Sequence, residues 1–373
     1  MINYNNLISL TQDLIRIDSQ NPPGEERKIA LFVSKYLKRL GLKVKIYEFK
    51  PRRSNVIAFL KGKSRRSLII TPHLDTVPSG NNWSLNPFSG RVIKDRIYGL
   101  GATDCKCNLA SLMAAIKSIV EEGVVLPYNL IFAATADEES GSGLGIRPLL
   151  ERGILKADEA LVLDADDFEI IVAQKGLMHI KVRILGKKAH GAYPDLGINA
   201  IDSSIRAIFG IKKLDLKFKK NSYLKPPTVN IGTIKGGDKV NVVADWCEFE
   251  LDFRFLPGTS SKYLLSRVRG VLRKYARSFK IEIMGIQKPY LISENYPLVK
   301  HLKKAFLRFK INPEIKGSEG ATVITFFKDK GIPAVATGFG VSACAHTVDE
   351  YVKIANLYKG TKALEYFLKT YKL

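Results

Sequence analysis

The chain of 373 residues has few cysteines, tryptophans and methionines, with four, two and four of them. Four cysteines are too few for the disulfide framework of a secreted scaffold in a chain of this size, so we expect reduced thiols. No stretch approaches the roughly 18 apolar residues of a membrane-spanning helix. The first residues also lack the basic and apolar segments of a signal peptide. We therefore expect a cytoplasmic protein that makes no use of a membrane.

Acidic side chains are also scarce, since 36 Asp and Glu face 59 Lys and Arg and leave a net charge of +23. Such an excess favours anionic partners: a small carboxylate substrate, an acidic carrier protein or a nucleic acid. The basic residues form only short, scattered clusters without an aromatic-rich RNA-binding signature, so nucleic acid is the least favoured of the three. A proteome-wide bias in amino-acid usage would explain the charge equally well.

What the chain does contain is a set of polar residues that follow apolar runs. Leu68–Thr71 is continuously apolar and is closed by Pro72, which predicts an interior strand of a parallel sheet. His73 and Asp75 come directly after it. Ligands of open α/β sheets bind at that end of the strands, and a carboxylate can orient a metal-binding histidine. Taken alone, the pair fits a loop histidine with a structural aspartate just as well.

A second polar segment, Gly99–Asn108, is rich in glycine and contains Asp104 just before a predicted helix from Asn108 to Glu122. An N-capping aspartate is the simpler interpretation, but it does not explain the glycines. Cys105 and Cys107 lack the second pair of ligands that a zinc site needs, so we expect them to be packing residues.

Two further apolar runs end in acids. Asn129–Thr135 leads to the consecutive acids of 137–139, and Ala160–Leu163 leads to Asp164. Neighbouring carboxylates repel one another and lose hydration energy when buried, unless cations pair with them. A solvated acidic turn is the alternative for the first group. Three strand ends that carry such residues are explained most simply by a divalent metal site.

These segments resemble the metal-dependent aminoacylases, carboxypeptidases and amino-acid deacylases, a family that includes acetylornithine deacetylase and succinyl-diaminopimelate desuccinylase. The resemblance covers nearly the whole chain and rests on His73–Pro78, Gly99–Lys106, Asp137–Glu139, Lys187–Pro194, Gly236–Pro257 and Ala345–Tyr351. It implies an enzyme that hydrolyses an amide bond in an N-acyl amino acid or a small peptide, next to a free carboxylate.

The same resemblance implies a centre of two divalent ions, Zn²⁺ in the first place and Co²⁺ as the alternative. Asp104 would bridge the ions, His73 and Asp164 would complete the shell of one, and Glu139 and His346 that of the other. Because relatives often have Glu in place of Asp164, its neighbours at positions 166 and 167 are alternative ligands.

The catalytic roles follow the resemblance as well. Glu138 would act as general base away from the ions, and Asp75 would orient His73. His190 would stabilise the oxyanion of the intermediate, reaching across to the site of a partner subunit. An ordinary surface-loop histidine is the alternative for His190.

Substrate contacts are expected from three places in the chain. Arg254 has the bidentate fork that suits a substrate carboxylate, although a cross-strand ion pair competes with this role. Asn241 would hydrogen-bond the same substrate. By resemblance, a small-residue loop would hold the substrate's backbone or carboxylate through Gly317, Ser318 and Gly320.

The expected fold is α/β: a mixed, mainly parallel sheet flanked by helices, as in zinc exopeptidases, formed by residues 1–176 and 288–373. Residues 177–287 show a β-α-β-β-α-β order, which is typical of a ferredoxin-like unit. In relatives this inserted unit is a lid that forms a homodimer. Within these regions we expect one strand over Arg91–Tyr98, one over Val242–Phe255 and the core of a helix over Arg267–Phe279.

Two other functions are compatible with the residues. A two-metal phosphoesterase would use similar ligands, and a binding protein with a degenerate site would use the positive charge to hold an acidic partner.

Overall fold

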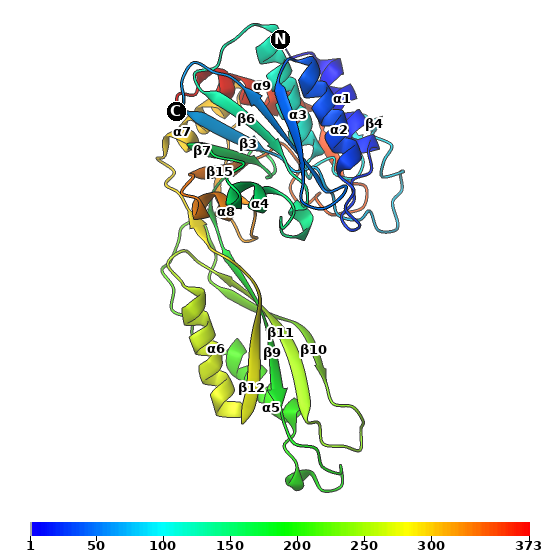
Figure 1. The fold of residues 1–373 in the computed structure, drawn as a ribbon, viewed down its shortest axis with the longest axis vertical. Coiled ribbons are helices and arrows are strands. Elements are labelled where there is room, and N and C mark those ends of the chain that lie inside the picture. The colour runs from blue at the N-terminus through cyan, green and yellow to red at the C-terminus, as the bar shows by residue number, and fades with distance from the viewer. Residues whose placement is uncertain (1) are drawn as a thin grey trace. The chain divides into compact units, whose positions relative to one another are not determined.

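The computed structural model describes residues 2–373 and divides them into two compact units (Figure 1). The larger unit runs as far as Val172 and continues with Ile292–Lys316 and Thr322–Leu373. The smaller unit consists of Ala173–Leu291 and the short segment Gly317–Ala321. The chain therefore changes units within a few residues of the boundaries expected at 176 and 288, and the 317–321 segment groups with the smaller unit. That the two units act as a catalytic domain and a lid stays a prediction.

The larger unit is organised around a nine-stranded mixed sheet. Its central strands are parallel, from β6 through β3 and β7 to β15, and antiparallel strands flank them. The strand order is β1 (Lys43–Glu48), β2 (Ser54–Leu60), β6 (Asn129–Ala134), β3 (Ser67–Thr71), β7 (Glu159–Leu163), β15 (Ala334–Thr337), β8 (Ile170–Gln174) and β13 (Tyr290–Leu291), with β14 (Ile315–Ser318) also paired to β8.

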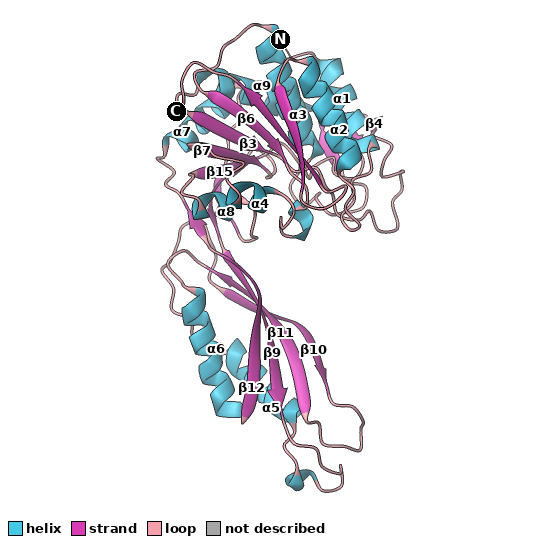
Figure 2. Cartoon of the chain, viewed as in Figure 1, coloured by secondary structure: helices cyan, strands magenta, loops and turns pink. Residues whose placement is uncertain are grey.

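Helices cover this sheet. The structure has α1 (Tyr4–Arg16), α2 (Arg27–Arg39), α3 (Lys106–Glu121), α4 (Ile146–Glu151), α7 (Pro297–Arg308), α8 (Ile324–Asp329) and α9 (Ile354–Thr370). Helix α3 packs against α1 and α9, and α4 packs against α8. Figure 2 shows α3 and α9 on one side of the sheet and α4 and α8 on the other. The central strands are consequently covered on both faces, which explains why β7 is buried along its whole length and is not alternately polar.

The smaller unit has the predicted order of elements. They are β9 (Gly176–Leu185), α5 (Ala200–Lys212), β10 (Thr228–Gly236), β11 (Trp246–Phe255), α6 (Ser261–Tyr275) and β12 (Ser278–Gln287). The strands pair antiparallel in the order β10-β11-β9-β12. Alternate residues of β11, such as Phe249 and Phe253, are buried under α5 and α6, while the residues between them are half-buried. The order of elements and the order of strands confirm the ferredoxin-like arrangement, and the period of two shows that one face of β11 is buried.

Three of the predicted elements have different bounds. Arg91–Tyr98 was expected as one strand but forms a hairpin of β4 (Arg91–Ile93) and β5 (Arg96–Tyr98), because Lys94 adopts a positive φ of 53° and turns the chain. These two strands form a small sheet with β16 (Tyr351–Lys353). Helix α6 begins at Ser261, whose predecessor Ser260 caps it, and ends before β12 begins at Ser278. Strand β11 begins only at Trp246.

No helix among residues 2–373 combines the length and the apolar character that crossing a membrane requires.

Candidate metal centre

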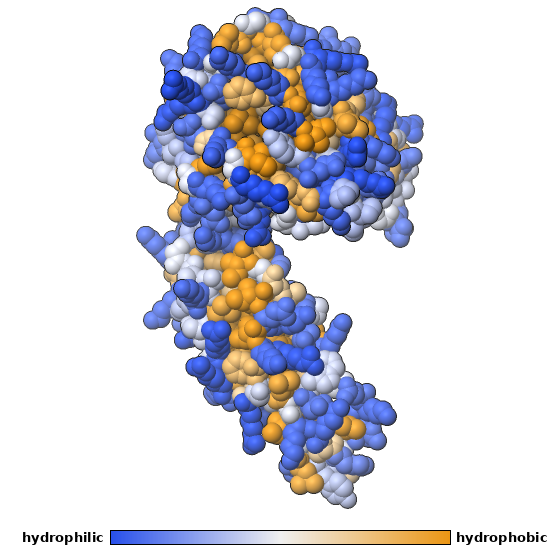
Figure 3. Space-filling model, in the orientation of Figure 1, coloured by the Kyte–Doolittle hydropathy of each residue, from blue (hydrophilic) through white to orange (hydrophobic). Residues whose placement is uncertain are grey.

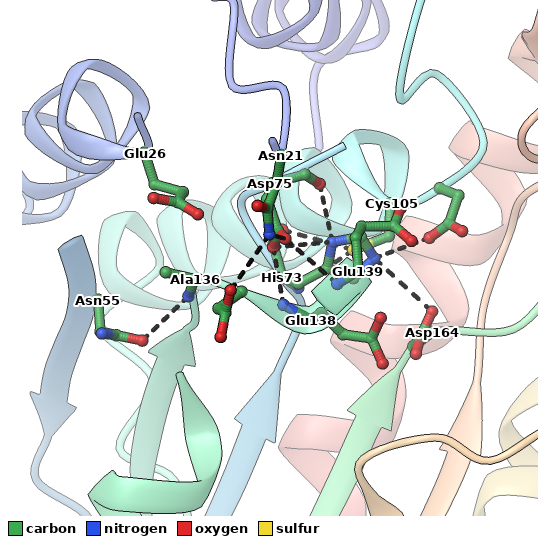
Figure 4. Close-up of polar contacts among 12 residues, drawn as sticks. Asn21, Glu26, Asn55, His73, Asp75, Cys105, Ala136, Glu138, Glu139 and Asp164 are labelled. Carbon is green, nitrogen blue, oxygen red and sulfur yellow. Dashed lines mark hydrogen bonds and ion pairs between the residues drawn. The ribbon is translucent and has the colours of Figure 1, made fainter. Parts of the chain in front are cut away.

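The predicted ligands of the larger unit come together where its parallel strands end. His73 follows β3, Glu139 follows β6 in the short 3-10 helix η1 (Glu138–Ser140), and Asp164 follows β7. His346 lies on the loop after β15, and Asp104 on the loop before α3. The carboxyl ends of parallel strands meet at one edge of a sheet, which brings these distant residues together. Figure 4 shows His73, Glu139 and Asp164 of this group.

Asp104 connects the cluster. Its Oδ1 lies 2.7 Å from Nε2 of His73, and its Oδ2 lies 3.2 Å from Nε2 of His346. The same His346 nitrogen is 3.2 Å from Oε1 of Glu139, and Nε2 of His73 is 3.8 Å from Oδ1 of Asp164. The structure thus brings all five predicted ligands together, with Asp104 between the two histidines.

The histidine geometry is that of a metal ligand. Nδ1 of His73 lies 2.9 Å from the backbone carbonyl oxygen of Asp75. A carbonyl only accepts hydrogen bonds, so Nδ1 carries the proton and the Nε2 lone pair points toward Asp104. A lone pair and a carboxylate oxygen 2.7 Å apart need a proton or a cation between them.

Asp75 therefore orients His73 through its backbone. Its carboxylate Oδ1 is 3.7 Å from the imidazole and accepts instead the backbone N–H of Glu138 at 3.1 Å. The other oxygen accepts the N–H of Glu139 at 3.2 Å. The Asp75 carboxylate is thus at ion-pair distance from His73 and at the same time holds the turn that carries the two glutamates.

The electrostatics of the cluster favour a cation. Burial and then the charge of Asp104 raise the pKa of Asp164 to about 7, and burial raises the pKa of Glu138 well above its usual range. Burial would also raise the pKa of Asp104, but the two imidazoles outweigh it and lower that pKa. Hydrogen bonds to Asp104 and Glu139 raise the pKa of His346 to about 10. A divalent ion would offset the repulsion among these buried carboxylates, and imidazole nitrogens and carboxylate oxygens are donors that bind zinc.

The structure bears on two alternative interpretations of this region. Asp104 does not cap α3, because the N-cap position is Cys105 and no side chain there accepts a capping hydrogen bond. Cys105 is close to the ligands, but its sulfur accepts the backbone N–H of His73 at 3.1 Å. Burial raises the pKa of this thiol to about 12. Its sulfur also lies within reach of the same ion as His73 and Asp104, so its role as a packing residue stays a prediction. Among Asp164 and the alternatives Asp166 and Asp167, ion-pair distance to a predicted ligand is found for Asp164 alone within residues 2–373.

One residue that positions the centre was missed. The carboxylate of Glu350, which is 1% exposed, accepts the backbone N–H groups of Gly101, Thr103 and Asp104 at 2.7–3.0 Å. It thereby holds the loop that carries the bridging aspartate. Glu350 belongs to one of the motifs of the resemblance, but its sequence position alone gives no hint of a partner almost 250 residues away.

The candidates of the smaller unit have local partners. Arg254 makes two hydrogen bonds to the carboxylate of Asp252, at 2.8 and 2.9 Å. Both residues lie on β11, so this ion pair is within one strand and not across strands as the alternative expected. His190 is exposed, and its Nδ1 accepts the N–H of Ala192 at 3.1 Å. Asn241 is exposed, and its backbone carbonyl accepts the N–H of Gly191 at 2.8 Å, so it lies next to the His190 loop.

The small-residue loop lies at the end of β14 and beyond. Ser318 Oγ donates to the carbonyl of Gly320 at 3.3 Å, and the buried Gly317 lies so close to the carbonyl oxygen of Tyr223 that an added Cβ would be 2.4 Å from it. The roles predicted for Gly317, Ser318 and Gly320 stay predictions.

Comparison with known proteins identifies the family. The model of peptidase family M20/M25/M40 matches residues 69–370. Acetylornithine deacetylase of Vibrio cholerae is 29% identical over 94% of this chain and 92% of its own length. A tripeptidase from Staphylococcus aureus has the same fold, with a TM-score of 0.83, 25% identity and coverage of 99% and 98% of the two chains. A dinuclear metal-binding M20 peptidase from Bacillus subtilis resembles the fold with a TM-score of 0.74 at 18% identity, over 98% and 97% of the chains.

These matches confirm the family inferred from the motifs and the mixed sheet flanked by helices. They do not favour the phosphoesterase or the degenerate binding protein. The chain belongs to peptidase family M20/M25/M40 and is a metal-dependent hydrolase of amide bonds in acyl-amino acids or small peptides.

Proposed function

We propose that this protein hydrolyses an N-acyl amino acid or a small peptide next to a free carboxylate, at a centre of two divalent ions bridged by Asp104. The observation that carries the proposal is the position of the Asp104 carboxylate, whose two oxygens contact different imidazoles. His73 and Asp164 would bind one ion, and Glu139 and His346 the other. The donor set of nitrogen and oxygen atoms suits Zn²⁺, with Co²⁺ as a substitute.

Bound ions of this kind lower the pKa of a water and polarise the scissile carbonyl. Glu138 would take the proton of that water and return it to the leaving amine. Its side chain extends toward Asp164 in Figure 4. Within residues 2–373, two groups of side chains could hold an ion, and Glu138 is in neither: His73 with Asp104 and Cys105, and Asp104 with Glu139 and His346. Burial raises the pKa of Glu138 well above its usual range, and a raised pKa favours a carboxylate that accepts a proton during catalysis.

We assign substrate recognition to the smaller unit. The guanidinium of Arg254 is half-buried and already paired with one carboxylate, that of Asp252, so a second carboxylate from a substrate would share or replace this partner. Asn241 and the oxyanion-stabilising His190 lie on adjoining exposed segments. Gly317, Ser318 and Gly320 would contribute backbone groups.

A homodimer through the smaller unit is part of the proposal. Strand β10 is an edge of its sheet, and α5 packs beside it with two exposed apolar side chains, Ile205 and Phe209, one helical turn apart. Unpaired strand edges and exposed apolar patches favour association. Helix α6, beside the other edge strand, presents a hydrophilic surface (Figure 3). It carries five basic residues and no acid, so two copies would repel one another there. A Phe209→Glu variant should run as a monomer in light scattering, and an unchanged dimer would place the interface elsewhere.

A cytoplasmic location is supported by the four cysteines, which are all free and buried, because such thiols persist in a reducing compartment.

The proposed activity is tested by loading the protein with two equivalents of Zn²⁺ or Co²⁺ and screening acetyl-, succinyl- and peptidyl-amino acids beside a nitrophenyl phosphate. We expect hydrolysis of one of the acyl compounds, loss of activity with a chelator and recovery when metal is returned. Hydrolysis of the phosphate ester alone would refute the assignment.

A further inference from the structure

A buried group of charged residues lies behind the turn that carries Glu138 and Glu139, and the proposed mechanism does not use it. Its centre is Arg53, whose guanidinium donates to the carboxylate of Glu26 through Nε at 2.8 Å and a terminal nitrogen at 2.7 Å. The same terminal nitrogen donates to Oδ1 of Asp137 at 2.8 Å. The side chains of Glu26, Arg53 and Asp137 are 0%, 8% and 8% exposed.

Asp137 forms the base of the turn. It has a positive φ of 65° and immediately precedes η1. Its backbone carbonyl accepts the N–H of Ser142 at 2.6 Å, and its Oδ2 accepts the N–H of Leu144 at 3.0 Å. The carboxylate that pairs with Arg53 thus also closes the loop around the two glutamates. A left-handed conformation is unfavourable for a non-glycine residue, so this one depends on its surroundings.

A second connection runs through Asn21. Its side-chain amide donates to Oδ1 of Asp137 at 3.3 Å and to Oδ2 of Asp75 at 2.9 Å. The Asp75 carboxylate in turn accepts the backbone N–H groups of both Glu138 and Glu139. Figure 4 shows Asn21 beside Asp75, with Glu26 farther from the metal ligands.

The loop of residues 19–24 is shaped around the guanidinium. A Cβ at Gly24, whose φ is +80°, would lie 2.3 Å from the central carbon of the Arg53 guanidinium. A glycine at this place lets the chain pass directly over the charged group. The contact explains why the segment 19–24 is rich in turn-forming residues, which the metal centre alone does not explain.

We propose that Arg53 and Glu26 are positioning residues, which hold the general base Glu138 and the ligand Glu139 in place through Asp137, Asn21 and Asp75. Arg53 neutralises two buried carboxylates at once, and its planar fork fixes the direction of both contacts. The turn is thereby fixed relative to β3 and β6 before any ion or substrate binds. The inference rests on the proposed roles of Glu138 and Glu139.

Lysine at position 53 separates geometry from charge, because it keeps the cation but has no planar fork. We expect Arg53→Lys to lower kcat by about tenfold to 100-fold, the usual effect of losing a partner that orients a metal ligand. KM should change less than kcat, because the substrate contacts lie elsewhere. In the Co²⁺-loaded protein, the visible absorption of the metal and the affinity for the more weakly bound equivalent should both change.

Glu159→Gln is the matched control. This carboxylate is also buried, accepts hydroxyl groups of Tyr296 and Tyr371 at 2.8 and 2.6 Å, and lies at the amino end of β7, away from the strand ends of the centre. It should lower thermal stability while leaving kcat and the cobalt spectrum of the wild type unchanged. Equal effects of both variants on kcat and the spectrum would show that the Arg53 group serves only stability.

If Arg53→Lys does not fold, Asn21→Ala tests the same connection without leaving a buried charge unpaired. A cobalt spectrum and kcat identical to those of the wild type in Asn21→Ala would overturn the inference. The cobalt titration needs no substrate. The wild type could prove inactive on all substrates while Arg53→Lys still changes the cobalt spectrum. That result would refute the proposed activity and support the positioning role.

Discussion

The two units of the molecule present their candidate residues in different ways. In the larger unit, the predicted ligands contact one another, and burial together with the charge of Asp104 raises the pKa of Asp164. In the smaller unit, Arg254 and His190 contact neighbours within two residues in the chain. The residues of the first group form a site through contacts with one another. Those of the second group would act together only when a substrate binds to them. We therefore expect mutations in the two groups to affect kcat, KM and metal content differently.

The largest effect is expected at Glu138 in the larger unit. Glu138→Gln keeps the shape but loses the base, so kcat should fall by about 10²–10⁴-fold, the usual contribution of general acid–base catalysis. Metal content should stay near that of the wild type, since Glu138 is not assigned as a ligand. Glu121→Gln, an exposed change on α3, is the control and should retain activity. Loss of both ions in Glu138→Gln would mean that Glu138 is a ligand.

A smaller effect is expected at His190 in the smaller unit. His190→Ala should reduce kcat by about 100-fold, as the loss of one oxyanion donor does, and should raise KM much less. Steady-state kinetics of Lys188→Ala, an exposed neighbour paired with Asp238, provides the comparison. Unchanged turnover in His190→Ala would return this histidine to the role of a surface residue.

A variant of Arg254 tests whether the smaller unit binds the substrate's carboxylate. Arg254→Lys keeps the charge but loses the bidentate fork, so KM should rise by about tenfold, which corresponds to about 1.4 kcal/mol of binding free energy. Arg183→Lys, at a cation that lies over the Trp246 ring on the neighbouring strand, should leave KM unaltered. If KM is the same in both variants, the pair with Asp252 is the whole function of Arg254.

The smallest effect concerns pH and the metal-free protein. The folded-state pKa of Asp164 is raised to about 7 from 3.8, so its protonated form stabilises the fold. That contribution is complete below about pH 4 and is lost as the pH rises through 7. The unfolding temperature of the metal-free protein should therefore fall by a few degrees between pH 6 and 8, and less so in Asp164→Asn. Coincident curves for the two proteins would contradict the assignment.

Much of the centre was predictable because parallel strands bring their carboxyl ends to one edge. Once Leu68–Thr71 and Ala160–Leu163 are recognised as strands, His73 and Asp164 must lie near each other. The positions of Glu350, Arg53 and Asn21 were not predictable in this way. Their partners are distant in sequence, and no periodic pattern marks a single buried polar residue on a loop or at a strand end.

The secondary structure, too, could be predicted from the sequence only in part. The alternation in β11 predicted a half-buried strand correctly, because its period of two reports directly on burial. The Arg91–Tyr98 hairpin was missed because its turn depends on Lys94 in a left-handed conformation, which the residue type does not announce.

The most direct test of the account is the metal content of the protein after metal loading and removal of excess ions. Elemental analysis should find two zinc or cobalt ions per chain, falling to one or fewer in Asp104→Ala. A wild type that binds no ion with its fold intact, or an Asp104→Ala variant that still binds two, would contradict a centre bridged by this carboxylate.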